Sequence, residues 1–288
     1  MKKKILLQLD ADRLPSSFDA VTALDAGADV LLARSGVAVE EVRNQIYGLL
    51  FTRGHKDLKY SAVFIGGSDV DAGEKLFKAA RDSFFGPFQV SVMLDSNGCN
   101  TTAAAAVAKI SGAMPLAGKK VVVLAGTGPV GRRAAGLLAM DGADVVMTSR
   151  RLDRVQAACQ LVEERFGAKI TPAEVTDEAS TRKALEGANA ALCCGAAGIR
   201  LLPESIWADH PDLAVAADIN AVPPLGVEGM EATFDGKERH GKILFGALGI
   251  GGLKMRVHHA CVGRLFEQNN AAFDAESVYA VAKEIASS

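Results

Sequence analysis

The chain has 288 residues, which is long enough for two ordinary domains that share a cleft. Hydrophobic residues make up 49% of it and charged residues 23%, as expected of a globular enzyme. A net charge of −2 provides no basic field for nucleic acid, and no apolar run approaches the roughly 20 residues that cross a bilayer. We therefore expect no nucleic-acid partner and no membrane segment.

The five cysteines and five histidines indicate neither disulfides nor a metal site. The cysteines are odd in number and show no C-x-x-C spacing, so reduced thiols in the cytoplasm are the expectation. The histidines show no H-E-x-x-H or similar ligand spacing. The basic start of the chain leads into only a short apolar run, which we interpret as a first strand and not as a signal peptide.

Strand-like and helix-like segments alternate through the first part of the chain. We expect strands at 5–10, 28–33, 61–65 and 89–94, and helices at 15–26, 39–50, 70–84 and 101–110. Such alternation is typical of parallel βαβ units. This part carries no phosphate-binding loop, so we assign it to the substrate.

The most informative stretch is the glycine-rich turn GTGPVG at 126–131. It follows an apolar run and precedes an alanine-rich helical segment and a second strand-like run at 145–148. Strand, G-x-G-x-x-G, helix and strand together form the dinucleotide-binding pattern, whose phosphates sit at the helix start. Gly126 makes the tight turn in this pattern, Gly128 lets the backbone approach the pyrophosphate, and Gly131 lets helix and strand pack closely. An ordinary glycine-rich βα turn is the less favoured alternative.

The end of the second strand favours NADP over NAD. NAD-specific folds usually place an acidic residue there, whereas this chain has Ser149, Arg150 and Arg151. Two guanidinium groups suit a 2′-phosphate, although a solvated basic pair is the alternative and NAD is not excluded. Turns at 195–198 and 220–224 follow later strands and face the same edge. The expected cofactor contacts are Gly126, Thr127, Gly128, Pro129, Val130, Gly131, Ser149, Arg150, Arg151, Ala196 and Asn220.

The rest of the chain completes an α/β fold of two domains. We expect helices at 152–166 and 181–185 and strands at 169–173, 190–194 and 213–219, with Cys193 and Cys194 as core thiols. The last stretch leaves a glycine-rich loop and becomes a helix, and a final helix follows from residue 274. The prediction is an N-terminal α/β substrate domain (1–114), a Rossmann-type NADP-binding domain (115–252) and C-terminal helices (253–288) that pack back on the first domain.

Four side chains are candidates for the substrate cleft. Phe18 lies in the first turn of its expected helix and is either core or a ring that stacks on a flat heterocycle. Thr102 is either a helix N-terminal hydroxyl or a site residue. Lys254 is expected in the first turn of its helix with His258 one turn behind it, and the alternative is a solvated pair.

The chain resembles the NADP-dependent methylene-tetrahydromethanopterin dehydrogenases of methylotrophic bacteria. The matching stretches are FTRG at 51–54, FFGPF at 84–88, MLDSNG at 93–98, NTTAAA at 100–105, VVLAGTGPVG at 122–131, PPLG at 223–226 and FGALGIGGLK at 245–254. The resemblance implies hydride transfer from a tetrahydropterin methylene bridge to NADP, or also NAD in some relatives. It implies that Phe18, Thr102, Lys254 and His258 line the cleft where pterin and nicotinamide meet. It also implies a homo-oligomer in which a neighbouring subunit closes part of this cleft.

The implied chemistry needs no general base, because loss of hydride from an N–CH₂–N carbon leaves a delocalised amidinium cation. Lys254 and His258 would then orient and stabilise charge. One alternative is a folate-specific methylene dehydrogenase or a shikimate dehydrogenase. Folate enzymes with cyclohydrolase activity carry Tyr-x-x-x-Lys, whereas Phe51 and Phe64 stand four residues after Tyr47 and Tyr60 here. A non-catalytic NADP-binding sensor is the other alternative.

Overall fold

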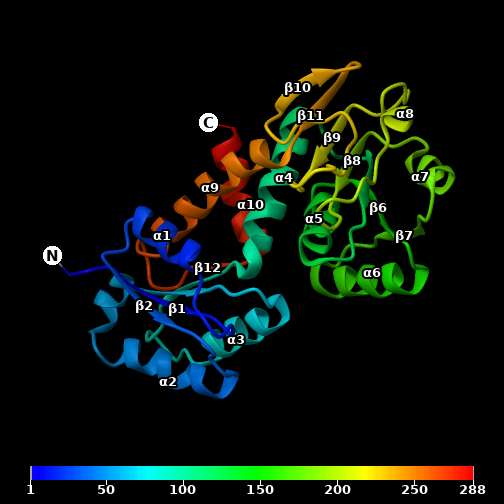
Figure 1. Cartoon of the computed structure of the whole chain (residues 1–288). Coiled ribbons are helices and arrows are strands. Elements are labelled where there is room, and N and C mark those ends of the chain that lie inside the picture. Colours follow the sequence, from blue (N-terminus) through cyan, green and yellow to red (C-terminus); the bar gives the residue numbers. More distant parts are fainter. Residues whose placement is uncertain (1, 288) are drawn as a thin grey trace. The chain divides into compact units, whose positions relative to one another are not determined.

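The computed structural model describes residues 2–287 and divides into two compact units (Figure 1). Unit 1 comprises the chain through Thr101 together with Met255–Val281, and unit 2 comprises Thr102–Lys254 and the chain from Ala282. The mixed α/β class predicted from the sequence is confirmed. The domain boundaries at 114/115 and 252/253 stay a prediction, because the two units are grouped by contacts and not by independent folding.

The sheet of unit 1 is entirely parallel and has the order β12-β4-β3-β1-β2. Its strands are β1 (Ile5–Leu9), β2 (Val30–Arg34), β3 (Ser61–Ile65), β4 (Ser91–Leu94) and β12 (Ala272–Phe273). The helices are α1 (Ser17–Asp25), α2 (Val39–Leu50) and α3 (Val70–Asp82), with the 3-10 turns η1 (His55–Tyr60) and η2 (Ser96–Gly98). Because β12 pairs with β4, the C-terminal part of the chain completes this sheet.

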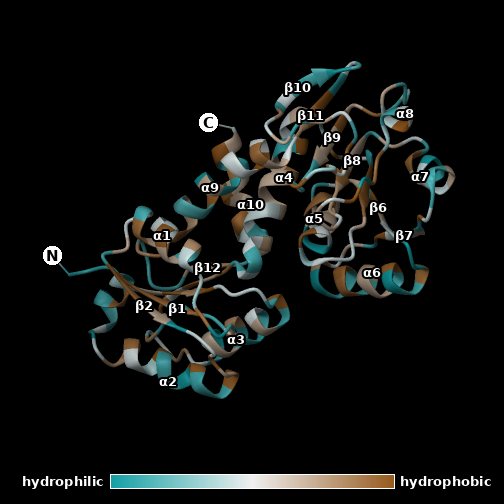
Figure 2. Cartoon of the chain, in the orientation of Figure 1, coloured by the Kyte–Doolittle hydropathy of each residue, from teal (hydrophilic) through white to brown (hydrophobic). Residues whose placement is uncertain are grey.

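Burial explains why the strands of unit 1 read as apolar runs. Every residue of β3 and β4 is buried, as are four of the five residues of β1. A strand covered on both faces loses the alternation of polar and apolar residues, and the inner strands are accordingly the hydrophobic ones in Figure 2. Helices α2 and α3 add Val42, Ile46 and Leu76 to the same core.

The sheet of unit 2 has the order β10-β11-β9-β8-β5-β6-β7, and only β10 is antiparallel to its neighbour. Its strands are β5 (Lys120–Leu124), β6 (Asp144–Ser149), β7 (Thr171–Glu174), β8 (Ala190–Cys193), β9 (Val215–Asp218), β10 (Asp235–Arg239) and β11 (Lys242–Phe245). The helices of this part of the chain are α5 (Pro129–Met140), α6 (Leu152–Phe166), α7 (Glu178–Leu185) and α8 (Glu204–Trp207). The helices α4 (Cys99–Ala113), α9 (Ala247–Arg264) and α10 (Ala275–Ala286) have residues in both units.

The glycine-rich segment before Lys254 is helical, so the predicted loop and the predicted first-turn position of Lys254 are wrong. Helix α9 begins at Ala247, and Lys254 lies seven residues further on. A Cβ on Gly249 would stand 2.2 Å from the carbonyl oxygen of Phe234, and one on Gly246 would stand 2.3 Å from that of Glu231. These glycines therefore allow close packing of the helix start on neighbouring backbone.

Each sheet has a point at which the strand order reverses. In unit 1 it lies between β1 and β3, because the chain moves from β1 to β2 on one side and returns to β3 on the other. In unit 2 it lies between β5 and β8. Ligands of open parallel sheets bind beyond the carboxyl ends of the strands at such points.

Candidate functional sites

The phosphate turn of unit 2 has the geometry that the glycine pattern predicts. Gly128 is the N-cap of α5 and Pro129 occupies its first turn, so the amides of Val130 and Gly131 have no partner within the helix. A Cβ on Gly131 would stand 2.4 Å from the carbonyl oxygen of Gly126, whereas one on Gly128 would meet nothing within 4 Å. Gly131 therefore serves packing, and Gly128 leaves open space in front of the helix N-terminus.

A cavity of about 520 Å³ lies at the carboxyl ends of β5, β6 and β8. Six of the predicted cofactor residues line it, namely Thr127, Gly128, Ser149, Arg150, Arg151 and Ala196. The lining also includes Gly195, from the predicted turn at 195–198, and residues that the sequence did not indicate, namely Ala125, Arg154, Cys194, Ile199 and Leu201. Cys194 is only partly buried and lines this cavity, so its prediction as a core thiol is wrong, while Cys193 is fully buried.

Asn220 does not line this cavity. Its side-chain amide donates to the Val222 carbonyl at 3.2 Å, and its Oδ1 accepts from the Val222 amide at 3.0 Å. The side chain thus closes a local turn after β9. The remaining predicted contacts, Gly126, Pro129, Val130 and Gly131, are not part of the lining and belong to the turn and to the start of α5.

Three arginines form the basic side of the cavity. Arg151 is already engaged, because its guanidinium contacts the Asp153 carboxylate through Nε at 3.0 Å and a terminal nitrogen at 2.5 Å. Arg154 lies three residues after Arg151 on α6, and this helical spacing brings it to the same side. That spacing was the sequence signal for Arg154.

We expect Arg150→Ala to weaken NADP binding by about 10- to 100-fold, because the variant loses one charge-assisted phosphate contact that contributes about 1.5–3 kcal/mol. Arg151→Ala should lose less, because Asp153 already holds its guanidinium. The affinity for NAD should stay the same in both variants, since NAD has no 2′-phosphate. Calorimetric titration with each cofactor measures this, with the exposed Arg165→Ala at the far end of α6 as a charge-matched control. Equal losses for both cofactors would contradict a 2′-phosphate site.

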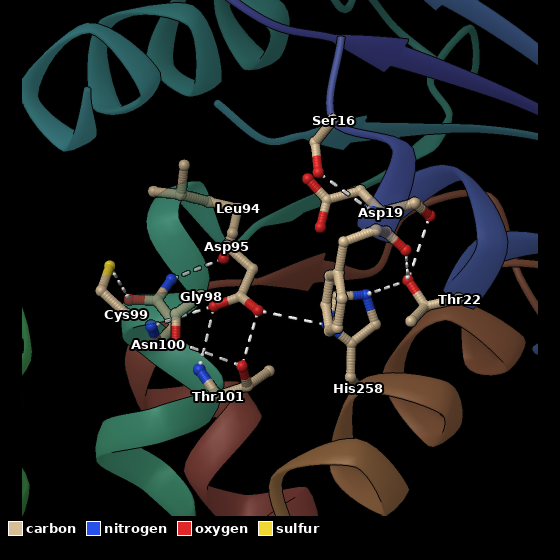
Figure 3. Close-up of polar contacts among 11 residues, drawn as sticks. Ser16, Asp19, Thr22, Leu94, Asp95, Gly98, Cys99, Asn100, Thr101 and His258 are labelled. Atoms are coloured by element: carbon tan, nitrogen blue, oxygen red, sulfur yellow. Dashed lines mark hydrogen bonds and ion pairs between the residues drawn. The ribbon is translucent and has the colours of Figure 1, made fainter. Parts of the chain in front are cut away.

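A buried polar network lies at the carboxyl end of β4 in unit 1 (Figure 3). Asp95 is 1% exposed, and its Oδ1 accepts the amides of Asn100 and Thr101, both at 3.0 Å. Its Oδ2 accepts the Thr101 hydroxyl at 2.6 Å and lies 3.3 Å from Nδ1 of His258. Asp95 therefore anchors the start of α4 and faces the His258 ring. The sequence placed Asp95 only in a turn.

His258 is 1% exposed, which excludes the solvated alternative for this residue. Its Nε2 lies 3.4 Å from the Thr22 hydroxyl, and its ring contacts Phe18 edge-on at 6.3 Å between centroids. Phe18 is 49% exposed, so its ring is available to a ligand and is not core. Unit 1 thus brings Phe18 and His258 together, with the exposed ring supported by the buried one.

Thr102 and Lys254 are both partly buried and group with unit 2. Thr102 lies in the first turn of α4, next to the buried Thr101. Lys254 lies on α9, one helical turn before His258. Their place in the reaction stays a prediction.

Two further carboxylates lie near the end of β1. Asp10 follows this strand and is fully buried, and Asp19 lies in the first turn of α1 and is partly buried. Burial raises the pKa of Asp10, and it raises the pKa of Asp19 to about 6 despite the opposing effect of His258. Both carboxyl groups therefore cost the folded protein stability when they are ionised.

We expect Asp19→Asn to stabilise the protein at neutral pH. Because the folded-state pKa is raised from 3.8 to about 6, the favourable contribution of protonated Asp19 is complete below pH 4 and is lost as the pH rises through 6. The amide does not titrate, so the stability of the variant does not fall in this way. The difference in unfolding free energy between the variant and the native protein should therefore grow by about 1–2 kcal/mol from pH 4.5 to pH 7.5, a value reduced for partial exposure. Urea unfolding at both pH values measures this gain. The exposed Asp25→Asn on the same helix should show none.

Among the described residues, no group of three or more His, Cys, Asp or Glu side chains is placed to hold a metal ion. No helix in residues 2–287 is long and apolar enough to cross a membrane.

The Rossmann-type sheet and its basic cavity define a dinucleotide-binding protein. The fold is similar to that of a 5-ketofructose reductase from Gluconobacter sp. CHM43, with a TM-score of 0.52, 15% identity and 99% of each chain covered. It is equally similar to a shikimate 5-dehydrogenase from Listeria monocytogenes, with a TM-score of 0.52, 14% identity and coverage of 98% and 96%. At such identities these likenesses show the fold alone.

Sequence comparison identifies the family. Residues 17–97 match the model of the N-terminal part of methylene-tetrahydromethanopterin dehydrogenase. The chain is 50% identical to the bifunctional protein MdtA of Methylorubrum extorquens, and 31% identical to the NAD(P)-dependent methylenetetrahydromethanopterin dehydrogenase of the same organism. Each match covers 99% of this chain and 100% of the relative. The chain therefore belongs to the methylene-tetrahydromethanopterin dehydrogenase family.

Proposed function

We propose that the protein oxidises methylene-tetrahydromethanopterin to methenyl-tetrahydromethanopterin and transfers the hydride to NADP. The observation that carries this function is the basic cavity at the carboxyl ends of β5, β6 and β8, in a chain of this family. The open space at Gly128 and the guanidinium groups beside it suit a pyrophosphate and a 2′-phosphate. The bound nicotinamide supplies the hydride acceptor.

The side chains of this protein bind and orient, and none has to carry a proton. The oxidised carbon becomes an amidinium cation whose charge is shared by two nitrogens, so hydride loss is not coupled to proton removal. Phe18 presents an exposed ring to the flat pterin. Thr102 and Lys254 contribute polar contacts to the same reaction, with Lys254 as an orienting and electrostatic group.

His258 acts through Phe18 in this proposal. With 1% exposure, its imidazole does not reach a ligand, and its contacts include the Phe18 and Phe64 rings, Thr22 and Asp95. It is therefore a positioning residue that holds the stacking ring in place.

The tetrahydrofolate carrier is the second candidate substrate, because it shares the pterin ring and the methylene bridge. A non-catalytic NADP sensor is disfavoured by the relatedness to a named dehydrogenase over the whole chain. We further propose a cytoplasmic homo-oligomer in which a neighbouring subunit completes the substrate site. The five cysteines are all unpaired thiols, which suits a reducing compartment.

An absorbance assay at the NADPH band tests the proposed function. Purified protein is mixed with NADP and either methylene-tetrahydromethanopterin or methylene-tetrahydrofolate. We expect NADPH with the first carrier and a smaller or equal rate with the second. Binding of NADP without reduction by either carrier would overturn the proposal and favour the sensor.

Lys254→Ala should lower the rate or the pterin affinity by about one to three powers of ten, as when a positioning or electrostatic group is removed. NADP affinity without pterin should barely change. The turnover number should show no steep bell-shaped pH dependence, because no side chain is needed as an acid or base. Steady-state kinetics beside a titration with NADP alone measure these quantities. A surface role predicts native rates and a stability change within about 0.5 kcal/mol.

A further inference from the structure

The end of β1 carries a set of polar groups that the reaction does not use. It lies at the strand-order reversal of unit 1, next to the end of β3, where a parallel sheet is expected to bind its ligand. Asp10 follows β1, Gly66 follows β3, and Asp19 lies one residue after the exposed ring of Phe18. These residues come from three separate segments of the chain.

Gly66 leaves a gap that two carboxylates face. A Cβ at this position would stand 2.6 Å from Oδ1 of Asp10 and 2.6 Å from Oδ2 of Asp19. Contacts of this length are too short for a side chain, so any residue other than glycine would displace one of the carboxylates. The absence of a side chain at residue 66 is therefore what allows both acids to occupy this edge.

Hydrogen bonding within the described residues leaves this edge incomplete. Asp10 Oδ2 accepts from the Ser16 amide at 2.7 Å and from the Gln8 side chain at 3.0 Å. Asp10 Oδ1 and Gln8 Oε1 are buried and have no hydrogen-bond partner, although Asp10 is fully buried and Gln8 is 1% exposed. Buried acceptors without a donor are rare in folded proteins, and an ordered water molecule is the smallest donor that satisfies such atoms.

No salt bridge to a lysine or arginine is found for Asp19 among the ion pairs of residues 2–287. Its charged neighbours are Asp10 and Asp95, which raise its pKa, and His258, whose opposing effect is smaller than that of burial. Asp19 is a partly exposed residue, in contrast to the fully buried Asp10. A ligand can therefore reach Asp19, and a ligand rich in N–H donors would relieve the cost of holding its charge.

We propose that Asp19 binds the donor edge of the substrate's pterin ring, formed by the ring N3–H and the 2-amino group. These two parallel N–H groups match the two oxygens of a carboxylate as a guanidinium does. With its edge bonded to Asp19, the ring can stack on the neighbouring Phe18, which is 49% exposed. The inference rests on the proposed function and adds the residue that recognises the heterocycle. Both one-carbon carriers have this edge, so Asp19 does not distinguish between them.

The test uses Asp19→Asn in the full-length protein, beside Asp25→Asn as a control for charge on the same exposed helix. The amide puts an N–H₂ group where the pterin needs an acceptor. We expect the Michaelis constant for methylene-tetrahydromethanopterin to rise by about 10- to 100-fold, the loss of a hydrogen bond to a charged group. The constant for methylene-tetrahydrofolate should rise by the same factor if that carrier is a substrate. The NADP affinity of Asp19→Asn should stay native, and so should the Michaelis constants and the NADP affinity of the control Asp25→Asn.

A pair of ligands separates recognition of this edge from a general disturbance. 6-Methylpterin carries the 2-amino group, and 6-methyllumazine carries an oxygen in its place. In a fluorescence titration, the native protein should bind 6-methylpterin at least 10-fold more tightly than 6-methyllumazine. Asp19→Asn should lose most of this preference. If Asp19→Asn has native kinetics and the same preference for the pterin over the lumazine, the inference about Asp19 is overturned. Activity of the native protein would still support the proposed function in that case. No turnover by the native protein overturns the proposed function itself, and the pterin preference then still decides whether Asp19 binds this edge.

Discussion

Gly128→Val should abolish the binding of both NADP and NAD and leave the protein folded. The native backbone has φ −75° and ψ 172° at this residue, a conformation that valine adopts readily. The added side chain would meet no protein atom within 4 Å of its Cβ, so it would point into the open space of the cavity. There it would occupy the position of the pyrophosphate, and the dehydrogenase activity should fall below detection.

The control for this prediction is Gly54→Val. Gly54 is also a helix N-cap in extended backbone, with φ −62° and ψ 148°, and a Cβ there meets nothing within 4 Å. It lies in unit 1 and outside the dinucleotide cavity. Calorimetric titration with NADP and thermal unfolding of both variants measure the outcome. Normal NADP binding to Gly128→Val would show that the phosphates lie elsewhere.

A comparison with Gly131 separates the two roles of the turn. A Cβ at residue 131 would stand 2.4 Å from a backbone oxygen of Gly126, so even Gly131→Ala has to move the turn. We expect this variant to lose about 1–3 kcal/mol of stability, as overpacking typically does. Gly128→Val should lose cofactor binding without this loss of stability.

Local patterns predicted most of the secondary structure. The segments 39–50 and 152–166 coincide with α2 and α6, because each has a helical period of apolar residues. The segment 61–65 coincides with β3, because it is a short apolar run that ends at a pair of glycines. The hairpin of β10 and β11 was missed. Its turn has positive φ at both His240 (51°) and Gly241 (68°), a type I′ geometry that the sequence signals more clearly when Asn or Asp precedes glycine.

The two sites differ in how far the sequence can reveal them. The phosphate turn is one contiguous segment, so its glycine spacing and the arginines after β6 were visible without a structure. The polar groups of unit 1 follow three different strands, and a buried Asp after a strand looks like any turn residue in the sequence. Only the pairing of β1 with β3 and of β3 with β4 places Asp10, Gly66 and Asp95 at one edge.

Asp95→Ala should destabilise the protein by about 3–5 kcal/mol, as expected when one partner of a buried charged network is removed. The substitution leaves the amides of Asn100 and Thr101 without this acceptor, and it leaves the Thr101 hydroxyl with only the Gly98 carbonyl at 3.4 Å. Both residues are fully buried, so water cannot replace the carboxylate easily. Helix α4 would also lose the acceptor at its first turn.

Asp95→Asn is the matched variant, because it keeps the volume and one oxygen for the two amides. It removes the negative charge that lies 3.3 Å from His258 Nδ1. We expect it to lose only about 1–2 kcal/mol of stability, since the amide can still serve the network. If His258 positions Phe18, as proposed, the asparagine variant should still raise the Michaelis constant for the pterin while NADP binding stays native. Urea unfolding and steady-state kinetics of both variants decide this, and native stability of Asp95→Ala would show that the network does not hold α4 in place.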